Sequence, residues 1–184
     1  MSISKQQEKY LETFVETYEN FPGEGITFKD LSLIYTDPIA ISIIQNYFFL
    51  KLSPYKADCV IGCDARGFII GTLIAQKLQL PFILARKPGK LPGDVLKKKY
   101  GLEYGTSELQ MHRHIITQYK SPIIADDVLA TGGTVIAVTE MLREIGIEVN
   151  SYAFVSEIAG LNARKRMQEE CDIIDSQIIS VLKH

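Results

Sequence analysis

The sequence predicts an α/β fold with a mainly parallel, twisted sheet flanked by helices. Short apolar runs of strand length recur along the chain, and segments with helical spacing of their apolar residues lie between them. Strands that alternate with helices are typical of parallel sheets, because a parallel connection needs a long crossover. The chain has 184 residues, which suits one well-packed domain and is short for two. We therefore expect a single domain over residues 1–184.

Two helices are expected near the N-terminus. Apolar residues recur at three- and four-residue spacing over 4–18 and predict a helix there. The segment 21–30 holds one proline and two glycines and predicts a loop. Asp37 and Pro38 are a typical N-cap residue and first-turn proline, so a second helix is expected to begin there.

Strands and helices then alternate along the rest of the sequence. The expected strands are 59–62, 81–85, 123–125, 149–155 and 178–182. One helix is expected to end near Gln79, another to cover 135–145 and a third to lie near 161–169. Between these elements, 87–109 shows no clear hydrophobic period and holds two prolines and four glycines. We interpret it as a lid or binding loop, and a β-hairpin or an ordinary surface loop is the alternative.

Composition argues against several classes of protein. The formal net charge of −2 at pH 7 gives no sign of a general nucleic-acid-binding protein. The longest apolar runs are far shorter than a membrane span, and residues 1–20 are polar, so we expect neither a membrane partner nor a signal peptide. Cys59, Cys63 and Cys171 lack metal-ligand spacing and fit a reducing compartment. We expect a cytoplasmic protein.

The segment 123–134, IIADDVLATGGT, is the most informative part of the sequence. A strand is expected to bring Asp126 and Asp127 to the carboxyl edge of the sheet, where α/β folds bind ligands. The glycine turn after them exposes backbone N–H groups, and the helix start adds partial positive charge. The spacing differs from both the P-loop and GxGxxG. We therefore predict a site for a phosphate monoester, and the alternative is an aspartate pair that only caps the helix. We call the predicted site the phosphate cradle and define it by the residues Ala130, Thr131, Gly132, Gly133 and Thr134.

This segment resembles the phosphoribosyl pyrophosphate signature of the type I phosphoribosyltransferases. Three further segments resemble the adenine phosphoribosyltransferases in particular: FKD at 28–30, DARGF at 64–68, and the run from RKPGKLP at 86–92 to LEYG at 102–105. The order and spacing match from about Asn20 onward. The resemblance implies the type I fold, with a small N-terminal hood over about 1–35 and a flexible lid loop over about 87–109.

The resemblance also implies an activity. Such an enzyme transfers the 5-phosphoribosyl group from phosphoribosyl pyrophosphate to N9 of adenine and yields AMP and pyrophosphate, a reaction of purine salvage. It uses Mg²⁺, which is bound mainly through substrate oxygens, so that no protein metal cage is expected. Family members are usually homodimers, and we expect the same assembly here.

Residue roles follow from the same resemblance. Glu103 would be the acid/base residue near adenine N7, Tyr104 would shield the reacting centre, and Asp126 and Asp127 would hold the ribose hydroxyls. The pyrophosphate would contact a loop that often carries a non-proline cis peptide, together with nearby basic side chains: Asp64, Ala65, Arg66, Arg86 and Lys90. Adenine would lie between Phe28 and Val128, and backbone groups of Thr27, Phe28 and Lys29 would read its edge.

Three positions depart from the family pattern. Lys29 stands where arginine is common, Val128 where leucine is usual, and Cys63 where threonine or leucine is more typical. These departures put the affinity in doubt more than the reaction. Two alternatives remain at this point: a phosphoribosyltransferase for another base, and a non-catalytic sensor of phosphoribosyl pyrophosphate.

Overall fold

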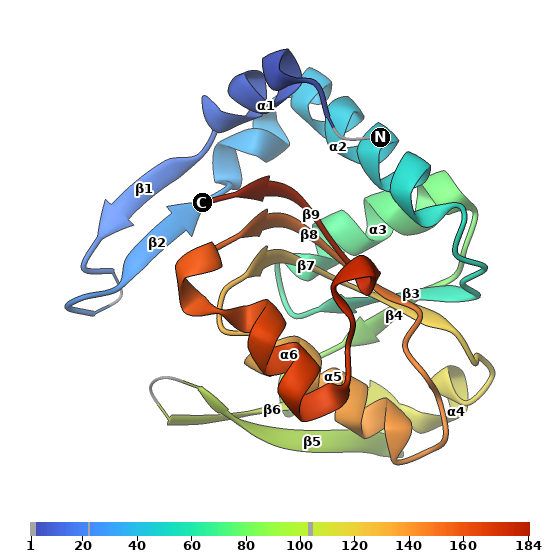
Figure 1. Cartoon of the computed structure of the whole chain (residues 1–184). Coiled ribbons are helices and arrows are strands. Elements are labelled where there is room, and N and C mark those ends of the chain that lie inside the picture. The colour runs from blue at the N-terminus through green and yellow to red at the C-terminus, as the bar shows by residue number, and fades with distance from the viewer. Residues whose placement is uncertain (1–2, 22, 103–104) are drawn as a thin grey trace.

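The computed structural model describes residues 3–21, 23–102 and 105–184, and it has a five-stranded sheet at its centre. The strand order is β4-β3-β7-β8-β9, and all neighbouring strands are parallel (Figure 1). The strands are β3 (Cys59–Cys63), β4 (Phe82–Ala85), β7 (Pro122–Leu129), β8 (Ser151–Glu157) and β9 (Ile178–Lys183). The predicted α/β fold with a mainly parallel sheet is confirmed.

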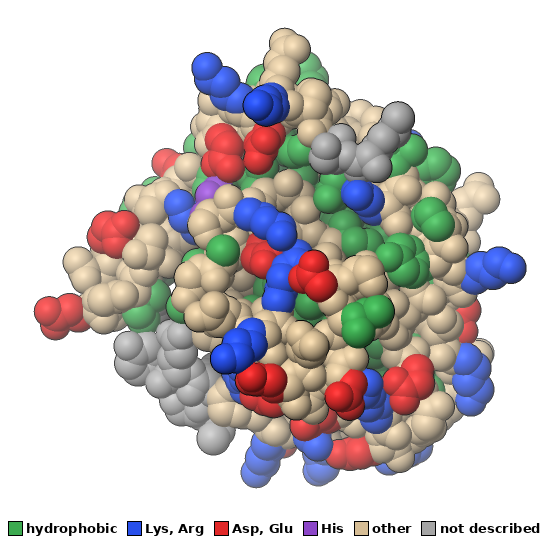
Figure 2. Space-filling model, in the orientation of Figure 1, with side chains coloured by type: hydrophobic (Ala, Val, Ile, Leu, Met, Phe, Trp, Pro, Cys, Tyr) green, Lys and Arg blue, Asp and Glu red, His purple; other side chains and the backbone are tan. Residues whose placement is uncertain are grey.

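Helices cover both faces of this sheet (Figure 1). One face packs against α2 (Pro38–Leu52) and α3 (Gly67–Leu78), and the other packs against α5 (Gly133–Arg143) and α6 (Ala163–Cys171). Successive strand residues therefore enter different cores: Ile123 joins the first and Ile124 the second. Within the described residues, none of the helices has the length and apolar character that crossing a bilayer requires. The face shown in Figure 2 carries intermixed acidic and basic side chains.

The N-terminal region differs from the prediction. Helix α1 (Lys5–Glu12) stops well before residue 18, and the chain then forms an antiparallel pair of strands, β1 (Glu16–Glu19) and β2 (Thr27–Asp30). The helix begins at a capping box of Ser4 and Gln7, as a helix start should. It gives way to strands because residues 16–19 satisfy their backbone groups by pairing with 27–30. A short 3₁₀ helix (Ser32–Thr36) leads to α2, which begins as predicted.

The segment predicted to be a loop forms a β-hairpin, the alternative left open above. Strand β5 (Val95–Leu102) pairs with β6 (Gly105–His112), and α4 (Arg113–Ile116) follows. Leu96 and Leu109 are buried against the core beneath. In the sequence, Lys98 interrupts the alternation of apolar and polar residues along β5. Its Nζ forms ion pairs with Glu140 Oε2 at 3.2 Å and Glu144 Oε1 at 2.7 Å on α5.

Two glycines make room for the Phe82 ring between β3 and α3. An added Cβ would lie 2.6 Å from the ring at Gly62 and 2.5 Å from it at Gly71. We expect Gly71→Ala to lower the free energy of unfolding by roughly 1–3 kcal/mol, because overpacking strains a dense core. Phe82→Leu in the same chain should restore part of the loss, and urea unfolding measures both. Gly160→Ala is the control, since nothing lies within 4 Å of its added Cβ. Equal unfolding free energies for the two alanine variants would contradict the packing described here.

Candidate active site

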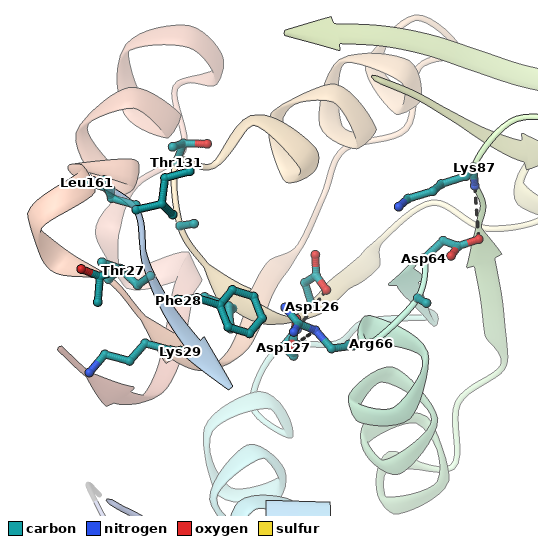
Figure 3. Close-up of a pocket in the computed structure, with 15 residues that line it drawn as sticks. Thr27, Phe28, Lys29, Asp64, Arg66, Lys87, Asp126, Asp127, Thr131 and Leu161 are labelled. Atoms are coloured by element: carbon teal, nitrogen blue, oxygen red, sulfur yellow. Dashed lines mark hydrogen bonds and ion pairs between the residues drawn. The ribbon is translucent and has the colours of Figure 1, made fainter. Parts of the chain in front are cut away.

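A pocket of about 640 Å³ opens at the carboxyl edge of the sheet, beside β2 (Figure 3). Five segments form it: Ile26 with β2, the turn between β3 and α3, Lys87 after β4, the end of β7 with the first residues of the phosphate cradle, and the chain that follows β8. Most of the residues predicted for the site line it: Thr27, Phe28, Lys29, Asp64, Ala65, Arg66, Asp126, Asp127, Val128, Ala130 and Thr131. Segments distant in sequence thus meet at one edge of the sheet, as parallel strands require.

Arg66 lies in the middle of this pocket (Figure 3). Its Nε is 2.6 Å from Asp127 Oδ2, and its guanidinium carbon is 5.2 Å from the centre of the Phe28 ring. The contact with Asp127 is an ion pair without hydrogen-bond alignment. The Arg66 side chain is 40% exposed, whereas that of Asp127 is 5% exposed. Arg66 therefore lies between the Phe28 ring and the Asp127 carboxylate.

Asp126 and Asp127 lie inside β7, which continues through Leu129 instead of ending before them as predicted. The strand runs past the end of β3 on one side, because the β3 pairing stops at Ala125, while β8 still pairs with it on the other. Burial and then the charge of Asp127 raise the pKa of Asp126 well above its usual value. Burial also raises the pKa of Asp127, and the Arg66 charge offsets part of that rise. Two crowded carboxylates of this kind are suited to holding partners that donate hydrogen bonds or carry positive charge.

The turn after β3 presses closely against these carboxylates. The Asp64–Ala65 peptide bond is cis, as predicted from the resemblance. An added Cβ on Gly67 would lie 2.8 Å from both Ala125 O and Asp126 Oδ1, so only glycine fits there. Asp64 is the meeting point of the nearby basic residues: Arg86 Nε donates to its Oδ2 at 3.4 Å, and Lys90 Nζ lies 3.7 Å from the same oxygen.

The phosphate cradle joins β7 to α5. Gly132 has φ +82°, a backbone conformation that favours glycine, and α5 begins at Gly133. The first turn of an α-helix leaves backbone N–H groups without partners inside the helix, and they point out of its N-terminus. Ala130 and Thr131 line the pocket directly, whereas Gly132, Gly133 and Thr134 follow as the start of the helix.

Comparison with known proteins identifies the family. A family model described as a phosphoribosyl transferase domain matches residues 34–182. An adenine phosphoribosyltransferase of Prochlorococcus marinus (strain MIT 9211) is 40% identical over 171 residues, which is 92% of this chain and 97% of that protein. The chain belongs to the adenine phosphoribosyltransferase family.

Solved structures of adenine phosphoribosyltransferases agree. The enzyme from Thermoanaerobacter pseudethanolicus is 33% identical with a TM-score of 0.87, and the alignment covers 96% of this chain and 99% of that one. The enzyme from Giardia lamblia, solved in complex with 9-deazaadenine, is 30% identical with a TM-score of 0.88, and the alignment covers 100% of this chain and 98% of that one. The type I fold predicted from the resemblance is thus confirmed over nearly the whole chain.

Some residues predicted for an adenine phosphoribosyltransferase site do not line the pocket. Arg86 and Lys90 lie beside it, paired with Asp64. Glu103 and Tyr104 fall outside the described residues. Their roles stay predictions.

Four pocket-lining residues were missed: Ile26, Lys87, Ile158 and Leu161. Ile158 and Leu161 directly follow β8, so the rule that ligands bind at carboxyl strand ends could have found them. Lys87 belongs to the RKPGKLP segment that carried the resemblance.

The structure also bears on the departures from the family pattern. The Lys29 Nζ donates to Thr17 Oγ1 at 3.0 Å, and Thr27 Oγ1 donates to Glu19 at 2.7 Å. Both side chains are thus engaged with β1, which fits base recognition through backbone groups in adenine phosphoribosyltransferases. Cys63 is fully buried in the core, and burial raises the pKa of its thiol.

Proposed function

We propose that the chain transfers the 5-phosphoribosyl group of phosphoribosyl pyrophosphate to N9 of adenine, yielding AMP and pyrophosphate. The observation that carries this proposal is one pocket that combines an aromatic wall, a carboxylate pair and the phosphate cradle. The names of the relatives support the same reaction, as does a Saccharomyces cerevisiae relative solved with adenine, which is 30% identical. Because the product is a nucleotide made from a free base, the reaction would serve purine salvage.

The base would lie against Phe28 and Val128, on the two sides of the pocket. A flat purine gains contact from an aromatic face and an aliphatic one. The β2 backbone would read its edge, because the Thr27 and Lys29 side chains are held by β1. Phe28 is available for this contact once the Arg66 guanidinium leaves its face.

The ribose and its leaving group would meet the charged part of the pocket. The bond from the anomeric carbon to pyrophosphate breaks while the bond to adenine N9 forms, so positive charge develops on the ribose. Asp126 and Asp127 would accept hydrogen bonds from the ribose hydroxyls and stabilise that charge. Arg66 would turn from Asp127 to the departing pyrophosphate, and Glu103 would share the proton that adenine loses.

Mg²⁺ fits this donor set as a substrate-borne ion. Among the residues that the structure describes, no cluster of three or more His, Cys, Asp or Glu side chains is placed to hold a metal. Asp126 and Asp127 offer hard carboxylate oxygens, which suit Mg²⁺ when substrate oxygens and waters complete its shell. When bound, the ion would neutralise charge on the pyrophosphate.

Assembly and location are proposals drawn from the family. We propose a homodimer, which sedimentation velocity would distinguish from a monomer by mass. We also propose a cytoplasmic location, which fits free cysteines at positions 59, 63 and 171.

The test supplies adenine, hypoxanthine, guanine or xanthine separately, with phosphoribosyl pyrophosphate and Mg²⁺, and measures nucleotide formation. We expect AMP from adenine and no comparable product from the other bases. Glu103→Gln should be slower by about 100-fold or more, because it cannot exchange a proton. Glu108→Gln in β6 is the control for the loss of a carboxylate close in sequence.

Other results would redirect the proposal. Turnover of a different base would overturn the placement of adenine beside Phe28. Binding of phosphoribosyl pyrophosphate without turnover of any base would point to a sensor.

A further inference from the structure

One segment, 157–171, supports the pocket at two separate places. Ile158 and Leu161 line the pocket where the chain leaves β8. Helix α6 then packs beneath the phosphate cradle, since an added Cβ on Gly132 would lie 3.3 Å from Met167 Cγ. Arg166 Nη1 also donates to Thr131 O at 3.4 Å. A shift of this segment would therefore move a pocket wall and the cradle together.

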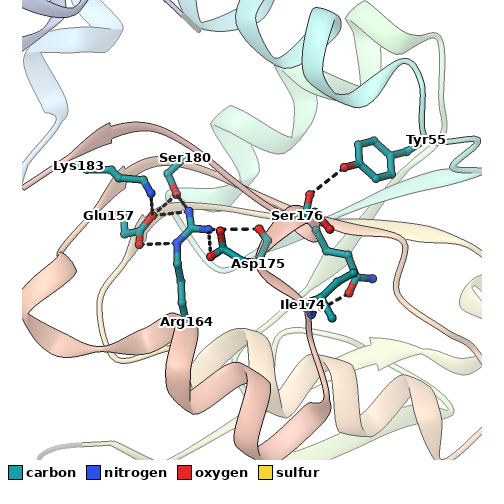
Figure 4. A network of polar contacts seen from close by, with 9 residues as sticks. Tyr55, Glu157, Arg164, Ile174, Asp175, Ser176, Ser180 and Lys183 are labelled. Carbon is teal, nitrogen blue, oxygen red and sulfur yellow. Dashed lines mark hydrogen bonds and ion pairs between the residues drawn. The ribbon is translucent and has the colours of Figure 1, made fainter. Parts of the chain in front are cut away.

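An ion pair between the buried Glu157 and the partly exposed Arg164 holds the segment in place (Figure 4). Arg164 Nε and Nη2 donate to the two carboxylate oxygens of Glu157, each at 2.6 Å. Arg164 Nη1 donates to Asp175 Oδ1, also at 2.6 Å, and Ser180 Oγ donates to Glu157 Oε2 at 2.7 Å. The pair thus connects the end of β8, the start of α6 and the neighbouring β9. A bidentate arginine–carboxylate pair fixes orientation as well as distance.

The local chain offers little else to hold the start of α6. Its N-cap, Asn162, has φ 53° and makes no side-chain hydrogen bond to the helix. The pair of Lys165 and Glu169 is exposed to solvent, with both side chains more than 60% exposed. Exposed helical pairs of this kind contribute only a few tenths of a kcal/mol. Arg164 is therefore the principal polar anchor of the helix start.

The surroundings of Glu157 also keep its carboxyl group ionised. Glu157 is 5% exposed. Burial raises the pKa of Glu157, but hydrogen bonds from Arg164 and Ser180 outweigh burial and leave that pKa below its usual value. Lys183 adds a further positive charge, with its Nζ 3.9 Å from Glu157 Oε2. Loss of Arg164 would leave the buried Glu157 carboxylate without its bidentate partner.

We propose that Glu157 and Arg164 are a positioning pair that places the pocket wall at Ile158 and Leu161 together with the phosphate cradle, and so sets the affinity for AMP. Neither side chain lines the pocket. The proposal rests on the proposed function, because AMP spans both places: its base would lie near the wall and its phosphate in the cradle.

The experiment measures AMP, adenine and ribose 5-phosphate binding by calorimetry at 15 °C, with the unfolding temperature of each variant recorded alongside. Arg164→Lys keeps the charge but loses the bidentate fork, and Glu157→Gln keeps the shape but loses the charge. We expect the Kd of AMP to rise about tenfold or more in both, because small misplacements of binding groups have large effects. The Kd values of adenine and of ribose 5-phosphate should rise together. Lys165→Met, on the same helix, should bind as the wild type does.

The outcomes separate positioning from mere stability. A lower unfolding temperature with unchanged Kd values would overturn the proposal, and so would weakening of only one fragment. If either variant fails to fold, Ser180→Ala decides, since it removes one hydrogen bond from Glu157 and should weaken AMP binding about threefold to tenfold. Wild-type protein that turns adenine into AMP keeps the proposed function whatever the variants show. Wild-type protein that makes AMP but does not bind it measurably would overturn the positioning proposal alone, and wild-type protein that neither makes nor binds AMP would overturn both.

Discussion

Asparagine in place of Asp126 is expected to stabilise the ligand-free protein and yet slow AMP formation by about 100-fold or more. The two effects have one cause, which is the burial of the Asp126 charge and then its closeness to the charge of Asp127 at the end of the sheet. In the proposed reaction the carboxylate pair would hold the ribose hydroxyls and stabilise the positive charge on the ribose, whereas without a substrate the two carboxylates repel each other. Removing one charge relieves that repulsion and removes the feature that the reaction needs.

The direction of the Asp126 pKa shift determines how the free energy of unfolding changes with pH. The pKa of Asp126 is raised in the folded protein above its ordinary 3.8, so the folded state holds a proton that the unfolded state has lost. Stability therefore falls as the pH rises from about 4 through the raised pKa, and the loss is complete above it. Asp126→Asn should be more stable than the wild type at neutral pH, and this advantage should disappear below about pH 4.

Urea unfolding between pH 3 and 8, run beside the activity assay, measures both effects. Asp94→Asn is the control, because the Asp94 side chain is 72% exposed and its partner Arg113 lies at the surface. A variant that is both slow and less stable at neutral pH would contradict the electrostatic account.

Methionine in place of Arg66 is expected to lower kcat/KM for phosphoribosyl pyrophosphate by about 100- to 1,000-fold, because a charge that stabilises the leaving group is lost. Inhibition by added pyrophosphate should weaken in parallel. Stability above pH 4 should also fall, since Asp127 loses the counter-charge 2.6 Å away. Arg66 provides no helix cap that its removal would break.

The double variant Arg66→Met with Asp127→Asn separates the two roles of Arg66. Its free energy of unfolding should rise again, because the uncompensated carboxylate is gone, whereas its kcat/KM should stay low. Arg113→Met removes an exposed ion pair and is the control for the loss of an arginine. Pyrophosphate inhibition equal to that of the wild type would show that Arg66 does not reach the leaving group.

The parts of the site that the sequence predicts are those that local chain geometry determines. Asp126, Asp127 and the residues after them form a strand, a turn and a helix within twelve residues, so composition and spacing suffice. Ile158 and Leu161 have no such local signal, and only the general rule for the carboxyl ends of parallel strands points to them. They reach the pocket because β8 pairs with β7 and leaves the sheet at the same edge, and a pairing of this kind is a property of the folded chain.

The errors in the fold have the same origin. Tyr18 continues the helical spacing of the apolar residues before it, and only the pairing of 16–19 with 27–30 decides that this segment is extended. In the hairpin, Lys98 can interrupt the apolar alternation because its ammonium group forms ion pairs with Glu140 and Glu144 on α5. Both cases depend on contacts with another segment of the folded chain, which the hydrophobic period and composition of a segment do not record.

The hairpin formed by β5 and β6 is held to the domain by two kinds of attraction that respond oppositely to salt. Leu96 and Leu109 bury apolar surface, which excluded salts such as sulfate reinforce. Lys98 is attached through partly exposed ion pairs, which dissolved ions screen. Different solutes thus change how firmly the hairpin is attached to the domain near Leu96 and beyond Lys98. Rates measured in different buffers would compare the same protein with its hairpin held to different degrees, so ionic strength is a variable to control in every comparison of its variants.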